Sequence, residues 1–295
     1  MKTRLWLLCC LTLIALAGAC GGGGSGGDDV GDDGGVGDGG DGDAVDAACT
    51  GLCTDAPPFT GMCTPGSTVQ CADCIDNDGD GKIDGSDIEC SGALDDDEGS
   101  FSTGIPGDNI DAVMQDCFFD GNSGAGNDGC NIHVCCLLGA PDKASCPIGA
   151  NRYNVSECPA PLGTGVLSQK CITTCGKLAP PGCDCFGCCT ICDPANTSAC
   201  YDILTNPTAS PNCNETNLAD PTACRRCTKN TMCGNSTCGG TTCILCPGQT
   251  LADLPASCSG STSCPVNTTA CVGGAGGTCG PNTWCSNGCC IGVIL

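Results

Sequence analysis

The segment CDCFGCCTIC, residues 183–192, holds five cysteines in ten positions and contains two CxxC units back to back. In a cytosolic protein such spacing is typical of zinc or iron–sulfur ligation, whereas in an exported protein it indicates disulfides. The whole chain has 37 cysteines but only five Phe, two Tyr and two Trp. Burial of large side chains therefore cannot alone offset a conformational entropy cost of about 1–2 kcal/mol per residue. Crosslinks must supply part of the stability.

The N-terminus has the pattern of an export signal. MKTR is a short cationic region, and LWLLCCLTLIALA after it is an apolar stretch of 13 residues, which is too short to span a bilayer. The A-x-A cleavage site Ala17–Ala19 precedes Cys20, and LAGAC resembles a bacterial lipobox with Ala where Leu is more usual. We predict a signal peptide over 1–19 and a lipid on Cys20 that anchors the protein in the bacterial outer membrane, at the cell surface. Secretion without lipid would cut the same bond and is the alternative.

Residues 20–48 are predicted to be a lipid-anchored, disordered linker, because they are nearly all Gly, Asp and small residues that cannot be buried. A calcium β-roll is not expected. Its repeat places Asp at the sixth position, and in a repeat that begins at Gly34 the sixth residue is Gly39. Residues 20–98 hold 20 of the 33 acidic residues and a single base, Lys82. The chain has a net charge of −23 and no basic patch, so nucleic acid is not an expected partner.

The cysteines after the linker fall into two sets of even number. Six lie between 49 and 90, and 28 lie between 117 and 290. This distribution predicts a Cys-flanked calcium-loop unit over 49–98, a second linker over 99–107 and a disulfide-rich module over 108–295. The expected fold class is small and disulfide-rich, mostly coil with short strands and a few short helices.

Local patterns predict a few regular elements within this coil. A buried strand is expected at the C-terminus, over 291–295. Short helices are expected where Asp can cap a first turn, at 108–119, 193–204 and 220–227. Neighbouring cysteines cannot easily pair with each other, so different partners are expected for the members of 135–136, 188–189 and 289–290.

DNDGDGKIDGSD, residues 76–87, matches a twelve-residue calcium loop at its ligand positions. Such a loop needs carboxylates at positions 1, 3 and 5, Gly at 6, a backbone carbonyl at 7 and acids at 9 and 12. Gly81 stands at position 6 and Ile83 at the apolar position 8, while the Asp at 12 is shorter than the usual Glu. A solvated acidic turn is the alternative. The predicted Ca2+ ligands are Asp76, Asp78, Asp80, the carbonyl of Lys82, Asp84 and Asp87.

The flanks of this loop are not those of a calcium sensor, which needs two long amphipathic helices. Cys71 and Cys74 precede the loop and Cys90 follows it. A disulfide among them would clip the loop shut, so the site is interpreted as a structural staple. The acidic run ALDDDE, residues 93–98, is interpreted as a solvated segment, with additional calcium ligands as the alternative.

The stretch CADCIDNDGDGKIDGSDIECSGALDDDE resembles a segment common in envelope proteins of myxobacterial type, and its loop resembles dockerin-type and EF-hand-like calcium loops. Cys74 departs from the pattern, since Gly is usual there. CFFDGNSGAGNDGC and CGPNTWCSNGCC are similar to parts of Cys-rich surface lipoproteins. The resemblance covers part of the chain and implies an envelope location, without a particular activity.

Two further features are candidate sites. FDGNSGAGNDG offers Asp120, Asn122, Asn127 and Asp128 to a second calcium ion, although a Gly-rich turn is the simpler interpretation. His133 is the single histidine, and its apolar and cysteine neighbours favour a packed or surface imidazole over a member of a Ser–His–Asp arrangement.

Apart from GGSGG at 23–27 in the Gly-rich linker, no G-x-S-x-G motif occurs, and H-E-x-x-H and phosphate-loop motifs are absent from the sequence, so an enzyme is not expected. The sequence therefore predicts a structural or adhesive surface protein whose partners are cell-surface proteins or polysaccharides. The alternatives are a secreted disulfide-rich inhibitor or carbohydrate-binding module, and a metal–thiolate protein.

Overall fold

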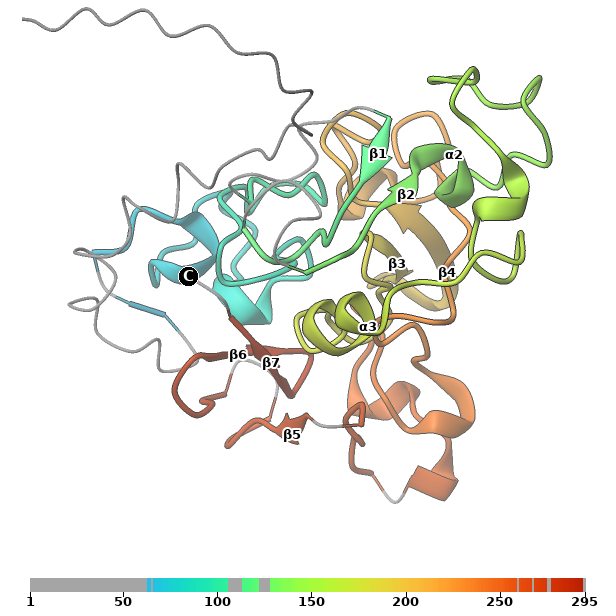
Figure 1. The fold of residues 1–295 in the computed structure, drawn as a ribbon. Coiled ribbons are helices and arrows are strands. Elements are labelled where there is room, and N and C mark those ends of the chain that lie inside the picture. The colour runs from blue at the N-terminus through green and yellow to red at the C-terminus, as the bar shows by residue number, and fades with distance from the viewer. Residues whose placement is uncertain are drawn as a thin grey trace, which may run out of the picture. The chain divides into compact units, whose positions relative to one another are not determined.

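The computed structural model describes residues 63–64, 66–105, 113–121, 128–258, 260–266, 268–274 and 277–293. The expected signal peptide, Cys20 and the linker, residues 1–48, lie outside these ranges, as do Cys49 and Cys53. Contacts group Thr50–Leu295 into one compact unit. Its described part is mostly coil with short strands and short helices, so the expected fold class is confirmed (Figure 1).

Helices are short throughout the described ranges. The α-helices there are α2, Val134–Leu137, and α3, Gln169–Cys175. Ser168 caps α3 by accepting a hydrogen bond from the N–H of Cys171 at 3.0 Å. The single-turn 3-10 helices are η1 (Gln70–Ala72), η2 (Asp84–Ser86), η3 (Val155–Glu157), η4 (Glu215–Asn217), η5 (Gly240–Thr242), η6 (Leu251–Asp253) and η7 (Ala256–Cys258).

The strands form small antiparallel sheets. In the described residues β1 pairs with β2, β3 pairs with β4, and β7 lies between β5 and β6. The longest pairing joins β3 and β4, with Cys188 opposite Leu204 and Cys192 opposite Cys200. The strands are β1 (Met114–Gln115), β2 (Ile132–His133), β3 (Cys188–Asp193), β4 (Asn196–Leu204), β5 (Thr269–Ala270), β6 (Thr283–Ser286) and β7 (Cys289–Gly292).

The helix expected at 193–204 is wrong, because this segment is a tight turn followed by β4. Asp193 accepts a hydrogen bond from the N–H of Ala195 at 2.8 Å, as a helix N-cap would. The chain nevertheless turns back, since Cys192 and Cys200 face each other across the hairpin and are joined by a disulfide. A covalent cross-strand bond therefore overrides the local capping preference.

The helix expected at 220–227 is also wrong. Asp220 accepts the N–H of Thr222 with its side chain and the N–H of Cys224 with its carbonyl, which closes a single turn. Cys224 and Cys227 are then bonded to different partners, so the turn is tied to two separate parts of the chain.

Residues 113–119 form β1 and a turn instead of the end of the helix expected at 108–119, whose first residues lie outside the described ranges. Met114 pairs with His133 in this small sheet. The strand expected over 291–295 is confirmed in part. Strand β7 includes the first two of these residues and ends at Gly292.

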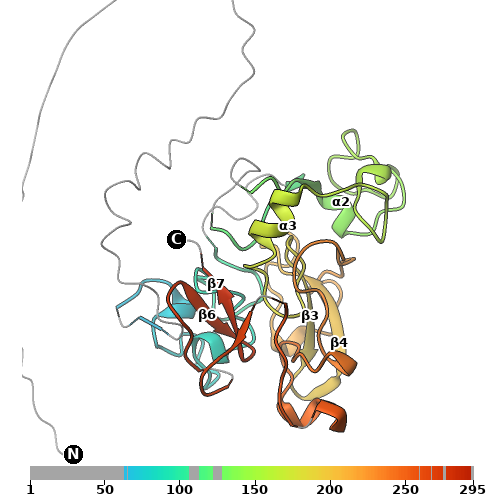
Figure 2. The same cartoon turned by 60° about the horizontal axis from the view of Figure 1, so that its bottom comes forward.

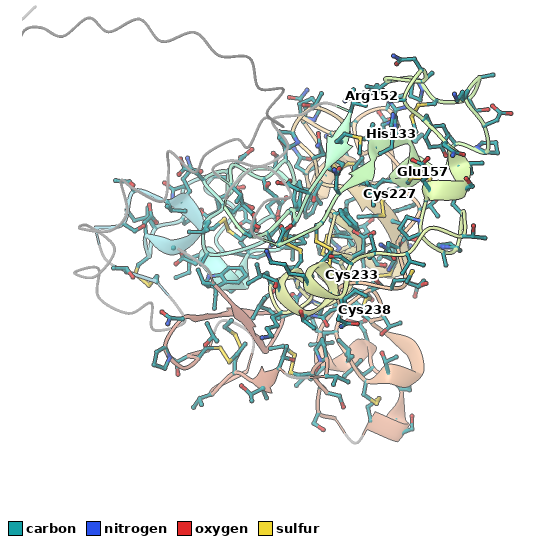
Figure 3. All side chains as sticks on the ribbon, viewed as in Figure 1. His133, Arg152, Glu157, Cys227, Cys233 and Cys238 are labelled. Atoms are coloured by element: carbon teal, nitrogen blue, oxygen red, sulfur yellow. A yellow bond between two sulfur atoms is a disulfide. The ribbon has the colours of Figure 1, made fainter. Side chains whose placement is uncertain are left out.

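Every cysteine among the described residues is paired, in 16 disulfides. Figure 3 shows the yellow sulfur–sulfur bonds spread over the described chain. Neighbouring cysteines have different partners, as expected: Cys135 is bonded to Cys146, and Cys136 to Cys158. No CxxC unit in the described ranges closes on itself, so none of them forms the dithiol of thioredoxin-like redox proteins.

Cystine replaces large apolar side chains in the interior. Almost half of the buried residues in the main core cluster are half-cystines, and they pack with a few fully buried aromatics such as Phe118, Tyr153 and Phe186. The described disulfides join cysteines either within 63–90 or within 117–290.

The segment expected to be a second linker, 99–107, is packed over its described residues. Phe101 donates its N–H to the carbonyl of Cys213 at 2.7 Å, and both Phe101 and Ile105 belong to the main core cluster. The described part of this segment therefore belongs to the interior. Its buried residues are Ser100, Phe101, Ser102, Thr103 and Ile105.

The C-terminal hairpin of β6 and β7 packs against the acidic segment far away in sequence. Figure 2 shows the first described segment, in blue, beside these two strands. Strand β6 approaches so closely that a Cβ on Gly85 would lie 2.3 Å from the carbonyl oxygen of Cys285. Trp284 is 2% exposed and packs with the Cys71–Cys90 disulfide. Gly at position 85 is thus required by this backbone contact.

Candidate cation site

The loop of residues 76–87 is anchored by disulfides. Cys71 is bonded to Cys90 across the loop, with Cα atoms 5.6 Å apart, and Cys74 is bonded to Cys63. The expected clip is therefore present, between Cys71 and Cys90. It holds the two ends of the loop at a fixed separation.

Three predicted ligands converge at the start of the loop. Carboxylate oxygens of Asp76, Asp78 and Asp80 lie within 4.8 Å of one another. The two oxygens of Asp76 accept the N–H groups of Gly79 at 2.6 Å and of Gly81 at 3.1 Å. Gly81 has a φ of +94°, which a residue with a side chain rarely adopts, so the sharp turn needs Gly at this position. We call these three acids the aspartate triad.

The side chain of Lys82 lies against the aspartate triad. Its Nζ is 2.6 Å from Oδ2 of Asp80 and 3.0 Å from Oε2 of Glu215. Partial burial opposes the charge on Lys82, but these two hydrogen bonds raise its pKa overall. Burial likewise acts to raise the pKa of Asp80, and the hydrogen bonds from Lys82 outweigh it and lower that pKa. A cation at the triad would therefore compete with the Lys82 ammonium for Asp80.

The last two predicted ligands lie outside the triad and are buried. Asp84 is 3% exposed and Asp87 is 5% exposed. Oδ1 of Asp84 accepts the N–H of Cys74 at 3.4 Å, and Oδ1 of Asp87 accepts the N–H of Glu89 at 2.9 Å. In both residues Oδ2 is buried without a hydrogen-bond partner. Such an oxygen is costly to bury unless a proton or a cation satisfies it.

Burial raises the pKa of several carboxyl groups around the loop. Loss of hydration raises the pKa of Asp84 to about 6 and that of Glu89 to about 9. It also raises the pKa of Asp87 and of Glu98, and repulsion from the charge of Asp80 adds to the effect at Asp87. A bound divalent cation would stabilise the ionised forms and lower these pKa values.

Glu98 closes the loop, a role that the sequence analysis missed. The run 93–98 was expected to be solvated, but Asp95 and Glu98 are fully buried. Oε2 of Glu98 accepts the N–H of Asn77 at 2.6 Å, and its Oε1 accepts the N–H of Asp84 at 2.7 Å. One carboxylate therefore ties positions 2 and 9 of the loop together. The sequence feature that could have indicated this role is the position of the acidic run, which begins three residues after Cys90.

The donor set suits a hard divalent cation. Every side-chain donor is a carboxylate oxygen, the ligand type that calcium prefers. Of the six predicted ligands, the structure brings the three of the aspartate triad together. Asp87 lies near enough to Asp80 for their charges to interact, whereas Asp84 lies beside the Cys63–Cys74 disulfide. The residues present therefore fit calcium at the triad, with Asp87 as the nearest additional carboxylate.

His133, labelled in Figure 3, is a packed residue. Its Nδ1 accepts the N–H of Cys135 at 3.1 Å, so its Nε2 carries the proton and donates to the carbonyl of Gly149 at 3.1 Å. The ring also contacts Tyr153, with centroids 5.0 Å apart. Both ring nitrogens are engaged by the backbone.

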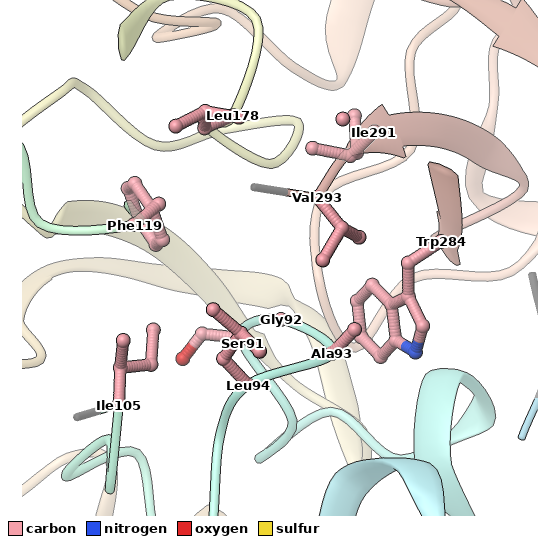
Figure 4. A pocket seen from close by; sticks show the side chains of 11 residues that line it. Ser91, Gly92, Ala93, Leu94, Ile105, Phe119, Leu178, Trp284, Ile291 and Val293 are labelled. Carbon is pink, nitrogen blue, oxygen red and sulfur yellow. The ribbon is translucent and has the colours of Figure 1, made fainter. Parts of the chain in front are cut away.

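An apolar hollow lies between the 91–94 turn and the C-terminal hairpin (Figure 4). Apolar side chains such as Phe119 and Trp284 line it, and Ser91 supplies the one hydroxyl among the lining residues. In Figure 4 the indole nitrogen of Trp284 lies on the side of the ring away from the other labelled residues. No charged side chain lines the hollow, so it lacks the polar groups that orient a ligand.

Among the described residues, no helix combines the length and the apolarity needed to cross a membrane. Comparison with protein-family models, with curated proteins and with solved structures gives no match to this chain.

Proposed function

We propose that this protein is an exported, lipid-anchored cell-surface protein of structural or adhesive type. The observation that carries the proposal is the pairing of every described cysteine in a disulfide. Disulfides at this density persist in oxidising compartments and are rare in the cytosol. Crosslinked coil presents side chains on a rigid frame, which suits contact with a cell-surface protein or polysaccharide.

Mass spectrometry of the mature protein, isolated from membranes of a Gram-negative host, tests the anchor. We expect the N-terminal peptide to begin at Cys20 and to carry the mass of acyl chains. The Cys20→Ser variant should appear in the soluble fraction with the same disulfides. Unmodified Cys20 in protein from the medium would instead favour a secreted inhibitor or carbohydrate-binding module, and dozens of free thiols would favour a metal–thiolate protein.

We also propose that the 76–87 loop holds calcium as a structural staple. Support comes from the convergence of the aspartate triad and from the buried, unpartnered Oδ2 atom of Asp87, the nearest additional carboxylate. The Cys71–Cys90 disulfide keeps the loop ends together in the absence of the ion. Bound calcium would neutralise charge that is otherwise balanced in the described structure by Lys82.

The Asp78→Asn variant is expected to bind calcium at least tenfold more weakly, because one ligand loses its charge. A tenfold change corresponds to about 1.4 kcal/mol. Asn can still accept the N–H of Asp80, which Oδ1 of Asp78 accepts at 3.0 Å, so the backbone of the loop should persist. Calorimetric titration of the mature chain measures the affinity, and the fluorescence of Trp284, which is buried against the loop-closing disulfide, provides a second signal.

The matched control for this variant is Asp96→Asn, an exposed acid outside the loop whose carboxylate accepts the N–H of Gln70 at 3.1 Å. Its calcium affinity should equal that of the wild type. Equal affinity in Asp78→Asn and wild type, or no uptake of calcium by either, would refute the calcium proposal.

A further inference from the structure

A second pair of buried carboxylates lies away from the loop, in the chain attached to α3. Asp120 is 4% exposed and Asp128 is 0% exposed, and carboxylate oxygens of the two lie within 4.8 Å of each other. The sulfur of Cys117 lies within the same distance, but it is bonded to Cys175 and is not a thiolate. The side-chain ligands available at this point are therefore the carboxylate oxygens.

Asp128 has an oxygen that the protein does not satisfy. Its Oδ1 accepts the N–H of Cys130 at 2.6 Å, whereas its Oδ2 is buried and has no hydrogen-bond partner. A fully buried carboxylate with an unsatisfied oxygen is costly, and a second carboxylate beside it adds repulsion in surroundings of low dielectric constant. A cation bound to both groups would remove both costs.

Disulfides fix the position of this carboxylate pair. Cys117 is bonded to Cys175 and Cys130 to Cys171, and both partners lie on α3. Residues 171 and 175 are one helical turn apart, so the two bonds leave the same face of the helix. The segments that carry Asp120 and Asp128 are therefore held to a common support, as a preformed metal site requires.

We propose that Asp120 and Asp128 form a second binding site for a hard divalent cation, and the choice of calcium as that cation rests on the export proposed above. Carboxylate oxygens without imidazole or thiolate favour calcium over zinc or copper. This site shares no residue with the 76–87 loop, so the inference does not rest on the calcium staple proposed above.

Native mass spectrometry of the mature chain, with calcium as the probe, tests the second site. We expect the wild type to take up two calcium ions, and the Asp128→Asn variant to take up one. Asn keeps the acceptor for the N–H of Cys130, so this variant should fold. The Asp78→Asn variant reports the loop ion separately, and Asp142→Asn, an exposed turn aspartate, is the matched control that should keep both ions.

Hydrogen exchange on the wild type provides a readout that does not depend on any variant. The amides of residues 128–133 should exchange at least tenfold more slowly in calcium than in chelator. The inference is overturned if a second ion persists in Asp128→Asn, if the wild type takes up a single ion that Asp78→Asn loses, or if exchange over 128–133 is the same in calcium and in chelator.

Discussion

Reduction of the disulfides is expected to unfold the described part of the protein completely at room temperature, with or without calcium. Almost half of the buried residues in the main core cluster are half-cystines, so little apolar surface remains to hold the chain together. A native disulfide contributes about 2–5 kcal/mol, against a net stability of about 5–15 kcal/mol for an ordinary domain. Near-ultraviolet circular dichroism and amide NMR dispersion, before and after reduction and alkylation, measure the loss. A reduced protein that stays compact would contradict this account.

Individual disulfides should contribute unequally to the free energy of unfolding. The difference tests whether they stabilise the protein by restricting the unfolded chain. Cys117–Cys175 closes a sequence separation of 58, whereas Cys192–Cys200 closes a separation of 8. The nested Cys130–Cys171 bond shortens the first loop to about 17 residues, from 117 to 130 and from 171 to 175, so the chain-entropy relation gives about 3 kcal/mol for the first bridge and about 2.5 kcal/mol for the second. Replacement of both cysteines by Ala in each pair, followed by urea unfolding, should show the larger loss for the longer loop. Equal losses would mean that the bridges act through native packing.

Removal of the Glu98 carboxylate is expected to lower both the stability of the protein and its affinity for calcium. In Glu98→Ala, the N–H groups of Asn77 and Asp84 lose a charged acceptor, and hydrogen bonds to charged groups contribute about 1.5–3 kcal/mol each. We expect the free energy of unfolding to fall by about 3 kcal/mol and calcium affinity to fall at least tenfold, because the loop loses its closure. Urea unfolding in chelator and calorimetry in calcium measure the two effects separately.

Two variants control for the Glu98 substitution. Asp96→Ala changes an exposed acid in the same run and should alter stability by about 1 kcal/mol or less. Glu98→Gln keeps one acceptor oxygen and the side-chain volume, and should lie between Glu98→Ala and the wild type. If the Glu98→Ala variant were as stable as Asp96→Ala and bound calcium with the same affinity, Glu98 would not close the loop.

The features that could be predicted from the sequence are those encoded by residue type at fixed spacing. The disulfide-rich coil followed from 37 cysteines with few aromatics, and the need for Gly81 followed from its place in the loop motif. Different partners for neighbouring cysteines followed from the geometry of adjacent residues. These inferences need no knowledge of contacts between distant segments.

The features that escaped prediction depend on such contacts. Asp193 and Asp220 do cap backbone N–H groups, but the disulfides Cys192–Cys200 and Cys188–Cys227, whose pairing the sequence does not specify, fix the chain in turns there and not in helices. Glu98 is buried because the loop folds over it, and the ion pair of Lys82 with Glu215 joins residues far apart in sequence. Neither of these two contacts can be recognised from a local pattern in the sequence.

The Cys135–Cys146 bond has a consequence for the lifetime of the protein. It encloses the exposed turn 141–145, the kind of segment at which proteolytic enzymes cut a backbone. A cut there would leave both new chain ends covalently joined through the sulfur bridge. A nicked molecule would keep its shape and migrate at full length on a non-reducing gel, and the fragments would separate only after reduction.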